Sequence, residues 1–211
     1  MAKFKLYNLF IVASYGKIIP KEIIDLPKYH VLNVHPSLLP KYRGPSPLQE
    51  QILQNEKHVG VSIMLIDEQV DHGPILMASE IEIENWPVGF RELEKTLAKE
   101  GATLLAGVIP HWVKGQMKAK DQIHEQATFT KKIEKQDGRI DLADNALKNY
   151  LKILAFDEWP KTYFEIQRSG RLIRVVITKA AYKNDKLEIL SVIPEGKKEM
   201  SYTDFMRGQR D

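Results

Sequence analysis

The chain has 211 residues, of which 43% are apolar, and its formal net charge at pH 7 is only +3. This composition predicts a packed core in one large domain or two small ones, and the net charge by itself does not indicate nucleic-acid binding. The absence of cysteine excludes disulfides, thiolate catalysis and cysteine-ligated zinc and fits a reducing cytoplasm, and no apolar run approaches the ~20 residues needed to span a bilayer.

The first part of the chain alternates between strand and helix patterns. Short β-rich apolar runs predict strands, whereas helical spacing of apolar residues or a proline at the first position predicts helices. In chain order the pattern predicts a strand at Leu9–Ala13, a helix at Pro20–Leu26, a strand at Val31–Val34, a helix at Pro47–Asn55, strands at Val59–Ile66 and Ile75–Ile83, and a long helix at Phe90–Val113. This alternation predicts an α/β sheet with covered faces.

The second part predicts a helix followed by a small antiparallel sheet. The polar, Lys-rich segment Lys114–Glu134 is interpreted as containing a linker, which divides the chain into domains at 1–117 and 134–211 with a linker at 118–133. The later elements are a helix at Asp144–Phe156 with Asp144 as its N-cap, strands at Thr162–Gln167, Leu172–Lys179 and Leu187–Ile193, turns at Ser169–Gly170 and Asn184–Asp185, and a capping box at Ser201–Asp204 before a final short helix. From Lys131 onward there are 17 Lys and Arg against 13 Asp and Glu, a mild basic excess that fits either a solvated surface or a module that contacts a nucleic-acid backbone.

Three polar residues suggest a site for acyl transfer to an amine. Asn33 and His35 lie two positions apart at the end of a predicted strand, so both side chains should point to the same side. Asp71 follows in a second loop, before Gly73 and Pro74. An amide can hold a developing oxyanion, an imidazole can move a proton, and a carboxylate can set the charge and tautomer of that imidazole. Taken alone, Asn33 would more often bond its own backbone beside a turn, His35 would more often be a structural or surface histidine, and Asp71 would more often be a turn former.

Four segments resemble the folate-dependent formyltransferases, and among these the enzymes that formylate methionyl-tRNA. They are LNVHPSLLPKYRG at Leu32–Gly44, IVASYGKIIP at Ile11–Pro20, GRIDL and AFDEWP between Gly138 and Pro160, and the closing EGKKEMSYTDFMRGQR from Glu195. The segments occur in the order of that family and cover nearly the whole chain. The resemblance implies a partial Rossmann-like α/β formyltransferase sheet, followed by a small, reduced OB-fold-like domain on the tRNA side.

The same resemblance implies roles for individual residues. Asn33, His35 and Asp71 would be catalytic, with Asp71 keeping His35 protonated or in the correct tautomer. The co-substrate would be 10-formyltetrahydrofolate, the acceptor initiator methionyl-tRNA, and the location cytoplasmic; no metal and no membrane are implied. Lys41 and Arg43 are interpreted either as surface charges or as contacts to an anionic substrate. The residues expected to bind the folate are Tyr15, Gly16, Lys17, Ile18, Ile19, Ser37, Leu38, Leu39, Pro40, Ile66 and Asp67.

Two alternatives to this function remain open. A sugar-nucleotide N-formyltransferase would share the Asn-x-His-Pro loop, and a catalytically silent relative would bind only RNA or folate. The chain also lacks the first strands of the family, so we expect Leu9–Ala13 to form an apolar sheet edge. That edge would be covered by the residues before it, by self-association or by a partner chain.

Overall fold

The computed structural model describes residues 7–168 and 170–208, which form two compact units. The first unit comprises the residues up to Gln51 together with Glu56–Trp86 and Leu93–Lys132. The second comprises Ile52–Asn55, Pro87–Glu92 and the residues from Ile133 onward. Within the described residues no helix is both long enough and apolar enough to cross a membrane.

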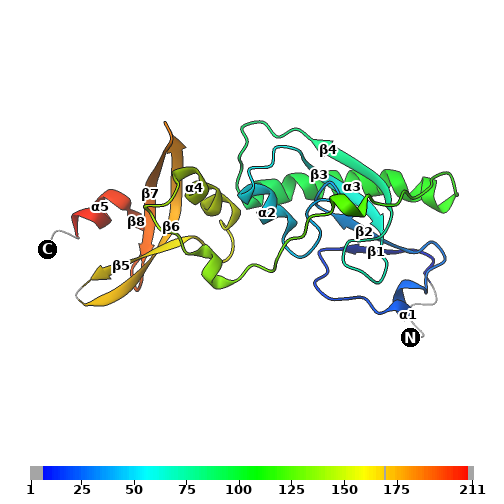
Figure 1. The fold of residues 1–211 in the computed structure, drawn as a ribbon, viewed down its shortest axis with the longest axis horizontal. Helices are drawn as coiled ribbons and strands as arrows, with labels where there is room; N and C mark the ends of the chain where they lie inside the picture. Colours follow the sequence, from blue (N-terminus) through cyan, green and yellow to red (C-terminus); the bar gives the residue numbers. More distant parts are fainter. Residues whose placement is uncertain (1–6, 169, 209–211) are drawn as a thin grey trace. The chain divides into compact units, whose positions relative to one another are not determined.

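The first unit is built on a four-stranded mixed sheet with the order β1-β2-β3-β4 (Figure 1). Its strands are β1 at Phe10–Ala13, β2 at Val31–His35, β3 at Val59–Leu65 and β4 at Ile75–Ile81. The β1 and β2 strands run parallel, and the remaining pairs are antiparallel. All residues of β3 except the last are buried, which explains its nearly continuous apolar sequence. The predicted α/β sheet is thus confirmed.

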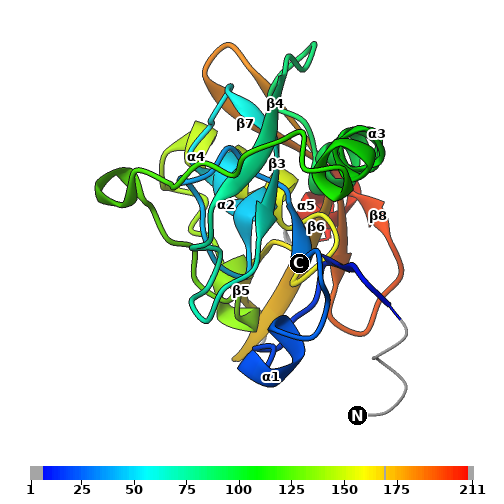
Figure 2. The same cartoon turned by 90° about the vertical axis from the view of Figure 1, so that its right-hand side faces the viewer.

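Helices complete the first unit. They are α1 at Lys21–Ile24, α2 at Pro47–Leu53 and α3 at Phe90–Val113, which has the predicted bounds. The end of α2 from Ile52 and the start of α3 up to Glu92 are assigned to the second unit. Figure 2 shows α3 nearly end-on beside the sheet. A Cβ added at Gly101 of this helix would lie 2.7 Å from Cγ1 of Val34 and 3.3 Å from Cγ1 of Val61, so glycine lets α3 pack closely on β2 and β3. The side chains of Leu32 and Val34 therefore belong to the core between the sheet and α3.

The β1 strand is an edge of this sheet. Its residues pair with β2, and the described part of the chain supplies no strand on its other side. Ile11 on β1 is 48% exposed, which agrees with the expected apolar edge. Folding back of the preceding residues would involve residues 1–6, which lie outside the described residues. Coverage by self-association or a partner stays a prediction, which light scattering and amide exchange can test.

The segment predicted as a linker lies instead along the first unit. Lys120 forms a bridge with Ile75, with N–H to O distances of 2.8 and 2.9 Å. Further on, the backbone of Arg43 donates to the carbonyl of Thr128 at 2.9 Å, and its own carbonyl accepts from the N–H of Thr130 at 2.7 Å. The polar composition of this segment was misleading because these contacts use backbone groups, which leave no periodic pattern in the side chains.

The second unit is an antiparallel sheet with the order β5-β6-β7-β8, packed against helices. Its elements are η3 at Lys135–Gly138, α4 at Ala146–Ala155, β5 at Tyr163–Arg168, β6 at Arg171–Lys183, β7 at Lys186–Pro194, β8 at Met200–Ser201 and α5 at Tyr202–Arg207. The short helix η2 at His124–Gln126 belongs to the first unit. The core is formed by Ile140, Ile153, Phe164, Val175, Ile177, Val192 and Phe205. Helix plus small antiparallel sheet is the predicted arrangement.

Caps and turns agree with the sequence, with one correction. The N-cap of α4 is Asn145, whose side chain accepts from the N–H of Lys148 at 3.0 Å, rather than the predicted Asp144. Ser201 caps α5 by accepting from the N–H of Asp204 at 3.1 Å. The Asn184–Asp185 turn has positive φ at both residues, as a tight hairpin requires. In the other predicted turn, Ser169 lies outside the described residues.

Candidate active site

The strand β2 presents two polar side chains on the face of the sheet opposite α3. Because side chains alternate along a strand and Leu32 and Val34 pack toward α3, Asn33 and His35 face the other way. Asn33 is half-buried and His35, the last residue of β2, is only 4% exposed. The backbone of the strand thus places an amide and an imidazole in one location.

The loop between β3 and β4 brings Asp71 to the same location. One carboxylate oxygen, Oδ2, accepts a hydrogen bond from the backbone N–H of Gly44 at 2.7 Å. The other, Oδ1, lies 3.5 Å from Nδ2 of Asn33 and 3.5 Å from Nδ1 of His35. The structure therefore brings together the three residues that the sequence singled out. Asp71 itself has a φ of 49°, a left-handed conformation that Asp tolerates better than most residues.

The buried ring of His35 has a defined tautomer. Its Nε2 lies 3.0 Å from the carbonyl oxygen of Tyr42, and because a carbonyl only accepts, Nε2 carries the proton in the neutral ring. Burial lowers the pKa of His35 from its usual value, and the charge of Asp71 opposes that effect without reversing it. The neutral form is therefore favoured in the unliganded protein, and its tautomer is set by the Tyr42 carbonyl, whereas Asp71 faces the unprotonated Nδ1. A second proton would bind at Nδ1, which faces the carboxylate.

Glycines allow the loops to approach this carboxylate closely. Gly44 has a φ of 110°, and a Cβ there would lie 2.8 Å from the carbonyl oxygen of Thr130. A Cβ at Gly73 would lie 2.0 Å from the carbonyl oxygen of Leu65, at the end of β3. Any larger residue at either position would push apart the loops that carry Asp71 and its donor.

Behind Asp71 lies a buried pair that sequence analysis did not find, formed by Arg43 and Gln122. Arg43 is 3% exposed, and its Nε and Nη2 atoms donate to Oε1 of Gln122 at 3.2 and 2.7 Å. Nε2 of Gln122 donates to the carbonyl oxygens of Asp71 at 3.0 Å and of Gly73 at 2.7 Å. The interpretation of Arg43 as a surface charge is wrong, and a contact between Arg43 and an anionic substrate stays a prediction. No pattern marks Gln122, because it is one amide in a polar segment 79 residues away from Arg43.

A second pair of side chains continues this network. Nδ1 of His124 lies 2.9 Å from Nη2 of Arg43. The His124 ring stacks on the ring of His72, with centroids 4.1 Å apart and planes 2° from parallel. His72 in turn places Nδ1 2.7 Å from a carboxylate oxygen of Asp67. Although His72 is adjacent to Asp71 in sequence, its ring contacts Asp67 and His124.

The residues expected to contact folate fall into two groups. Tyr15 and Ile18 are 58% and 81% exposed, and the neighbouring Gly16 and Lys17 are also exposed, so this loop is free to contact a ligand. Ser37 and Leu39, in contrast, are 0% and 8% exposed. The remaining predicted contacts, which are half-buried, are Ile19, Leu38, Pro40, Ile66 and Asp67.

Ser37 and Leu39 both hold the loop to the core, and contact of either residue with a folate stays a prediction. Oγ of Ser37 donates to the carbonyl of Lys41 at 2.7 Å, and the carbonyl of Ser37 accepts from Oγ of Ser62 at 2.8 Å. The N–H of Leu39 donates to the same Ser62 hydroxyl at 3.1 Å. These bonds account for the polar members of the loop without any ligand.

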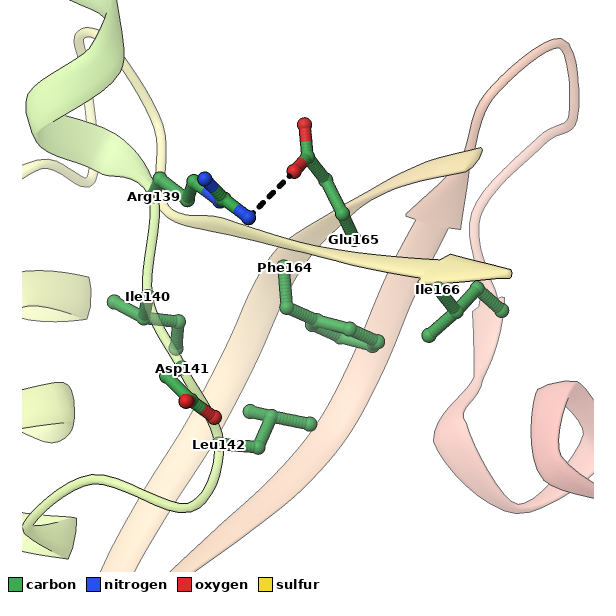
Figure 3. A pocket seen from close by; sticks show the side chains of 7 residues that line it. All are labelled: Arg139, Ile140, Asp141, Leu142, Phe164, Glu165 and Ile166. Atoms are coloured by element: carbon green, nitrogen blue, oxygen red, sulfur yellow. Dashed lines mark ion pairs between the residues drawn. The ribbon is translucent and has the colours of Figure 1, made fainter. Parts of the chain in front are cut away.

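The second unit has a depression of about 560 Å³ that offers no comparable chemistry. In Figure 3 its charged side chains Arg139 and Glu165 pair with each other at 3.0 Å, and Phe164 and Ile166 lie on the other side of β5. A third charged side chain in the lining, Asp141, accepts from the backbone N–H of Ala143 at 2.9 Å through Oδ1. Among the described residues no group of three or more His, Asp or Glu could hold a metal ion.

Comparisons with known proteins identify the family. A sequence model described as Formyl transferase matches residues 3–109, and one described as Formyl transferase, C-terminal domain matches residues 132–186. A methionyl-tRNA formyltransferase of Sulfurihydrogenibium sp. is 42% identical over 74% of this chain and 50% of its own length. One of Chloroflexus aurantiacus is 34% identical over 94% of this chain and 70% of its own. The chain thus spans between half and three quarters of the length of these relatives.

A solved structure shows the same fold. The structure of HypX from Aquifex aeolicus in complex with tetrahydrofolic acid covers 97% of this chain with a TM-score of 0.74, at 16% identity and over 39% of its own length. This likeness extends to both units of the chain. Together with the sequence matches, it confirms the predicted fold class. The chain belongs to the formyl transferase family.

Proposed function

We propose that this chain transfers a formyl group from 10-formyltetrahydrofolate to the amino group of methionyl-tRNA. The observation that carries the proposal is the position of Asp71 at the end of β2, where its Oδ1 lies 3.5 Å both from Nδ2 of Asn33 and from Nδ1 of His35. The names of the relatives support methionyl-tRNA as acceptor, and the tetrahydrofolic acid bound to HypX supports a folate as donor. Such a reaction belongs to translation initiation, and the proposal therefore includes a cytoplasmic location.

The first step is attack of the unprotonated amine on the formyl carbon. A C–N bond forms, the C=O π electrons move to oxygen, and the tetrahedral oxyanion needs a donor. Asn33 supplies this donor through Nδ2, which is held near Asp71 but at 3.5 Å makes only a long contact and remains available. An aligned donor of this kind stabilises the transition state by roughly 3–4 kcal/mol.

The second step moves one proton from the attacking amine to the leaving nitrogen of the folate. Asp71 and Nδ1 of His35 form a proton-accepting pair, because the proton that turns the ring into imidazolium binds on the side of the carboxylate. The C–N bond to the folate then breaks, the carbonyl re-forms, and the leaving nitrogen takes the proton. The products are the formylated amine and tetrahydrofolate, with no net gain or loss of protons.

Formylation of methionyl-tRNA by the purified chain and three variants tests the proposal. Asp71→Asn and His35→Ala should abolish transfer, and Asn33→Ala should slow it by about 10²–10³-fold. His58→Ala is the matched control, because His58 also pairs with a carboxylate, that of Glu80 at 2.6 Å, but on the surface. Full activity in all three site variants would contradict the assignment, and saturation by a sugar nucleotide without response to methionyl-tRNA would favour the sugar-nucleotide alternative.

The exposed loop at Tyr15–Ile19 would hold the folate in this proposal. Large apolar side chains left exposed together, as Tyr15 and Ile18 are, commonly mark a contact surface. Titration of tetrahydrofolate against wild type and Ile18→Asp tests this part separately from catalysis. Equal affinities would place the folate elsewhere.

A further inference from the structure

Tyr42, whose carbonyl accepts from Nε2 of His35, has an unusual backbone conformation. Its φ is 61°, in the left-handed region that a bulky residue rarely adopts. Such a conformation costs free energy and persists only where the surrounding contacts hold it, which is common beside functional groups. The contacts that hold Tyr42 therefore bear on the direction of the carbonyl that it presents to His35.

Thr128 holds the backbone of Tyr42 from both sides. Oγ1 of Thr128 accepts from the N–H of Tyr42 at 2.8 Å, and its carbonyl accepts from the N–H of Arg43 at 2.9 Å. The N–H of Arg43 and the carbonyl of Tyr42 belong to one planar trans peptide unit, in which the two groups point in opposite directions. The hydrogen bond from Arg43 to Thr128 therefore also fixes the direction of the Tyr42 carbonyl, toward Nε2 of His35.

Glu56 holds the side chain of Tyr42, and it belongs to the first unit with Tyr42 and Thr128. Its Oε2 accepts from the Tyr42 hydroxyl at 3.2 Å and from the Lys41 ammonium at 3.3 Å, while its Oε1 accepts from the backbone N–H of His58 at 3.1 Å. Although burial opposes ionisation, these hydrogen bonds lower the pKa of Glu56, so the group is a carboxylate at neutral pH. Relaxation of Tyr42 to an ordinary φ would break its bond to Glu56 or to Thr128.

The neutral ring of His35 carries one proton and lies between two acceptors. The Tyr42 carbonyl lies 3.0 Å from Nε2, and Oδ1 of Asp71 lies 3.5 Å from Nδ1. A carboxylate is ordinarily the stronger acceptor, so the proton stays on Nε2 because the Tyr42 carbonyl is held closer. Only this tautomer leaves the lone pair of Nδ1 free to take a second proton beside Asp71.

We propose that Thr128 and Glu56 are positioning residues for His35: acting through Tyr42, they aim its carbonyl at the ring and keep the ring proton on Nε2. The consequence for catalysis rests on the proposed function, because it concerns the proton that passes from the amine to the folate nitrogen. The tautomer itself does not depend on that function and is measurable without substrate.

The ¹⁵N chemical shifts of the His35 ring, measured by NMR at about pH 8 where the ring is neutral, report which nitrogen carries the proton. The His35 signals are those that vanish in His35→Ala. In Thr128→Ala the ratio of the Nε2–H to the Nδ1–H tautomer should fall by roughly 2–13-fold, the change in equilibrium that the loss of one hydrogen bond ordinarily produces. Tyr42→Phe should change the ratio in the same direction, and Thr128→Ser should restore it, because serine keeps the acceptor.

Tyr182→Phe is the matched control for Tyr42→Phe. The Tyr182 hydroxyl also donates to a carboxylate, that of Asp185 at 3.0 Å, but in the second unit. This control should keep the wild-type tautomer. An unchanged ratio in both Thr128→Ala and Tyr42→Phe, or an equal change in Tyr182→Phe, would overturn the inference.

The pKa of His35, titrated by the same NMR signals, separates positioning from a general loosening of the loop. Burial lowers this pKa, and the charge of Asp71 and the hydrogen bond to Tyr42 partly offset the effect of burial, whereas the charge of Arg43 adds to it. Loss of the Tyr42 acceptor with burial intact should lower the pKa further. Loosening that admits water should raise it toward about 6.5, and a raised pKa in Thr128→Ala would count against a positioning role.

Failure of this inference is distinguishable from failure of the proposed function. If the wild type formylates methionyl-tRNA, kcat of Thr128→Ala should fall with the tautomer ratio at constant KM and recover in Thr128→Ser. An active wild type with an unchanged ratio in Thr128→Ala and Tyr42→Phe refutes only the positioning role. An inactive wild type whose ratio changes in both variants refutes the function and supports the positioning of the ring. Unfolding midpoints are measured alongside, and if Thr128→Ala is unfolded at the assay temperature, Tyr42→Phe decides.

Discussion

Truncating Gln122 to alanine should damage both the stability of the first unit and its chemistry. The wild-type side chain donates to the carbonyls of Asp71 and Gly73 and accepts twice from the buried guanidinium of Arg43. Alanine removes all four hydrogen bonds. Since Gln122 is 6% exposed and Arg43 3%, water does not readily replace the lost partners.

The size of the effect follows from these bonds. Two hydrogen bonds between neutral groups contribute about 1 kcal/mol each, and the contact with a cation contributes about 1.5–3 kcal/mol, so we expect a loss of about 3–5 kcal/mol. A domain of this size is stable by about 5–15 kcal/mol, so most molecules should remain folded. The loop that carries Asp71 would lose the two hydrogen bonds from Gln122 to its carbonyl oxygens. A displacement of about 1 Å in a catalytic group can lower kcat about 10²-fold.

Chemical unfolding and steady-state formylation, measured on the same preparations, test this reasoning. Gln122→Glu separates the two effects, because it keeps the acceptor for Arg43 but loses the donor to Asp71 and Gly73. We expect it to be more stable than Gln122→Ala but equally poor in kcat. Gln126→Ala is the control, since Gln126 is exposed in the same segment. A destabilised Gln122→Ala with unchanged kcat would refute a positioning role for Gln122.

Two further predictions concern pH and loop packing. Burial lowers the pKa of His35 in the folded state. The stability that this residue contributes is therefore fully present above its unfolded-state pKa of about 6.5 and is lost as the pH falls below that value. The free energy of unfolding, measured between about pH 5 and 7, should depend less steeply on pH in His35→Asn than in wild type, and an equal slope would contradict this. Gly73→Ala should lower both the unfolding midpoint and kcat, because its Cβ would overlap the Leu65 carbonyl. The control Gly107→Ala has open space around it in α3 and should raise the free energy of unfolding by about 0.5–1 kcal/mol. Similar midpoints for the two variants would argue against close packing at Gly73.

The part of the site that was predictable from sequence is the part with local causes. Asn33 and His35 share a side because a strand alternates, and the loop after β2 carries a distinctive sequence. The continuous apolar run of β3 and the helical spacing of α3 likewise predict these elements with little error. Asp71 was a candidate as a carboxylate in a second loop, but its role came from the resemblance to the family, since an Asp shortly before a Gly is otherwise an ordinary turn residue.

The part that was missed has long-range causes. Arg43 looks like a solvated cation until Gln122, 79 residues later, supplies its acceptor. The pKa of His35 depends on how completely the folded loops exclude water, which no local pattern reports. The N-cap of α4 moved by one residue because Asp144 and Asn145 are both good caps, and only the backbone geometry distinguishes them.

The hydrogen bond from Gln122 to the carbonyl oxygen of Asp71 also implies an order of events during synthesis of the chain. Gln122 follows Asp71 by 51 residues, so at about 5–20 residues per second a ribosome adds it about 3–10 s later. Throughout that interval the nascent chain already contains both β2 and Asp71, but the guanidinium of Arg43 has no amide to bond and cannot be buried cheaply. The site at Asp71 should therefore form only after α3 and the segment that carries Gln122 have been synthesised, so the proposed activity would be one of the last properties that the growing first unit acquires.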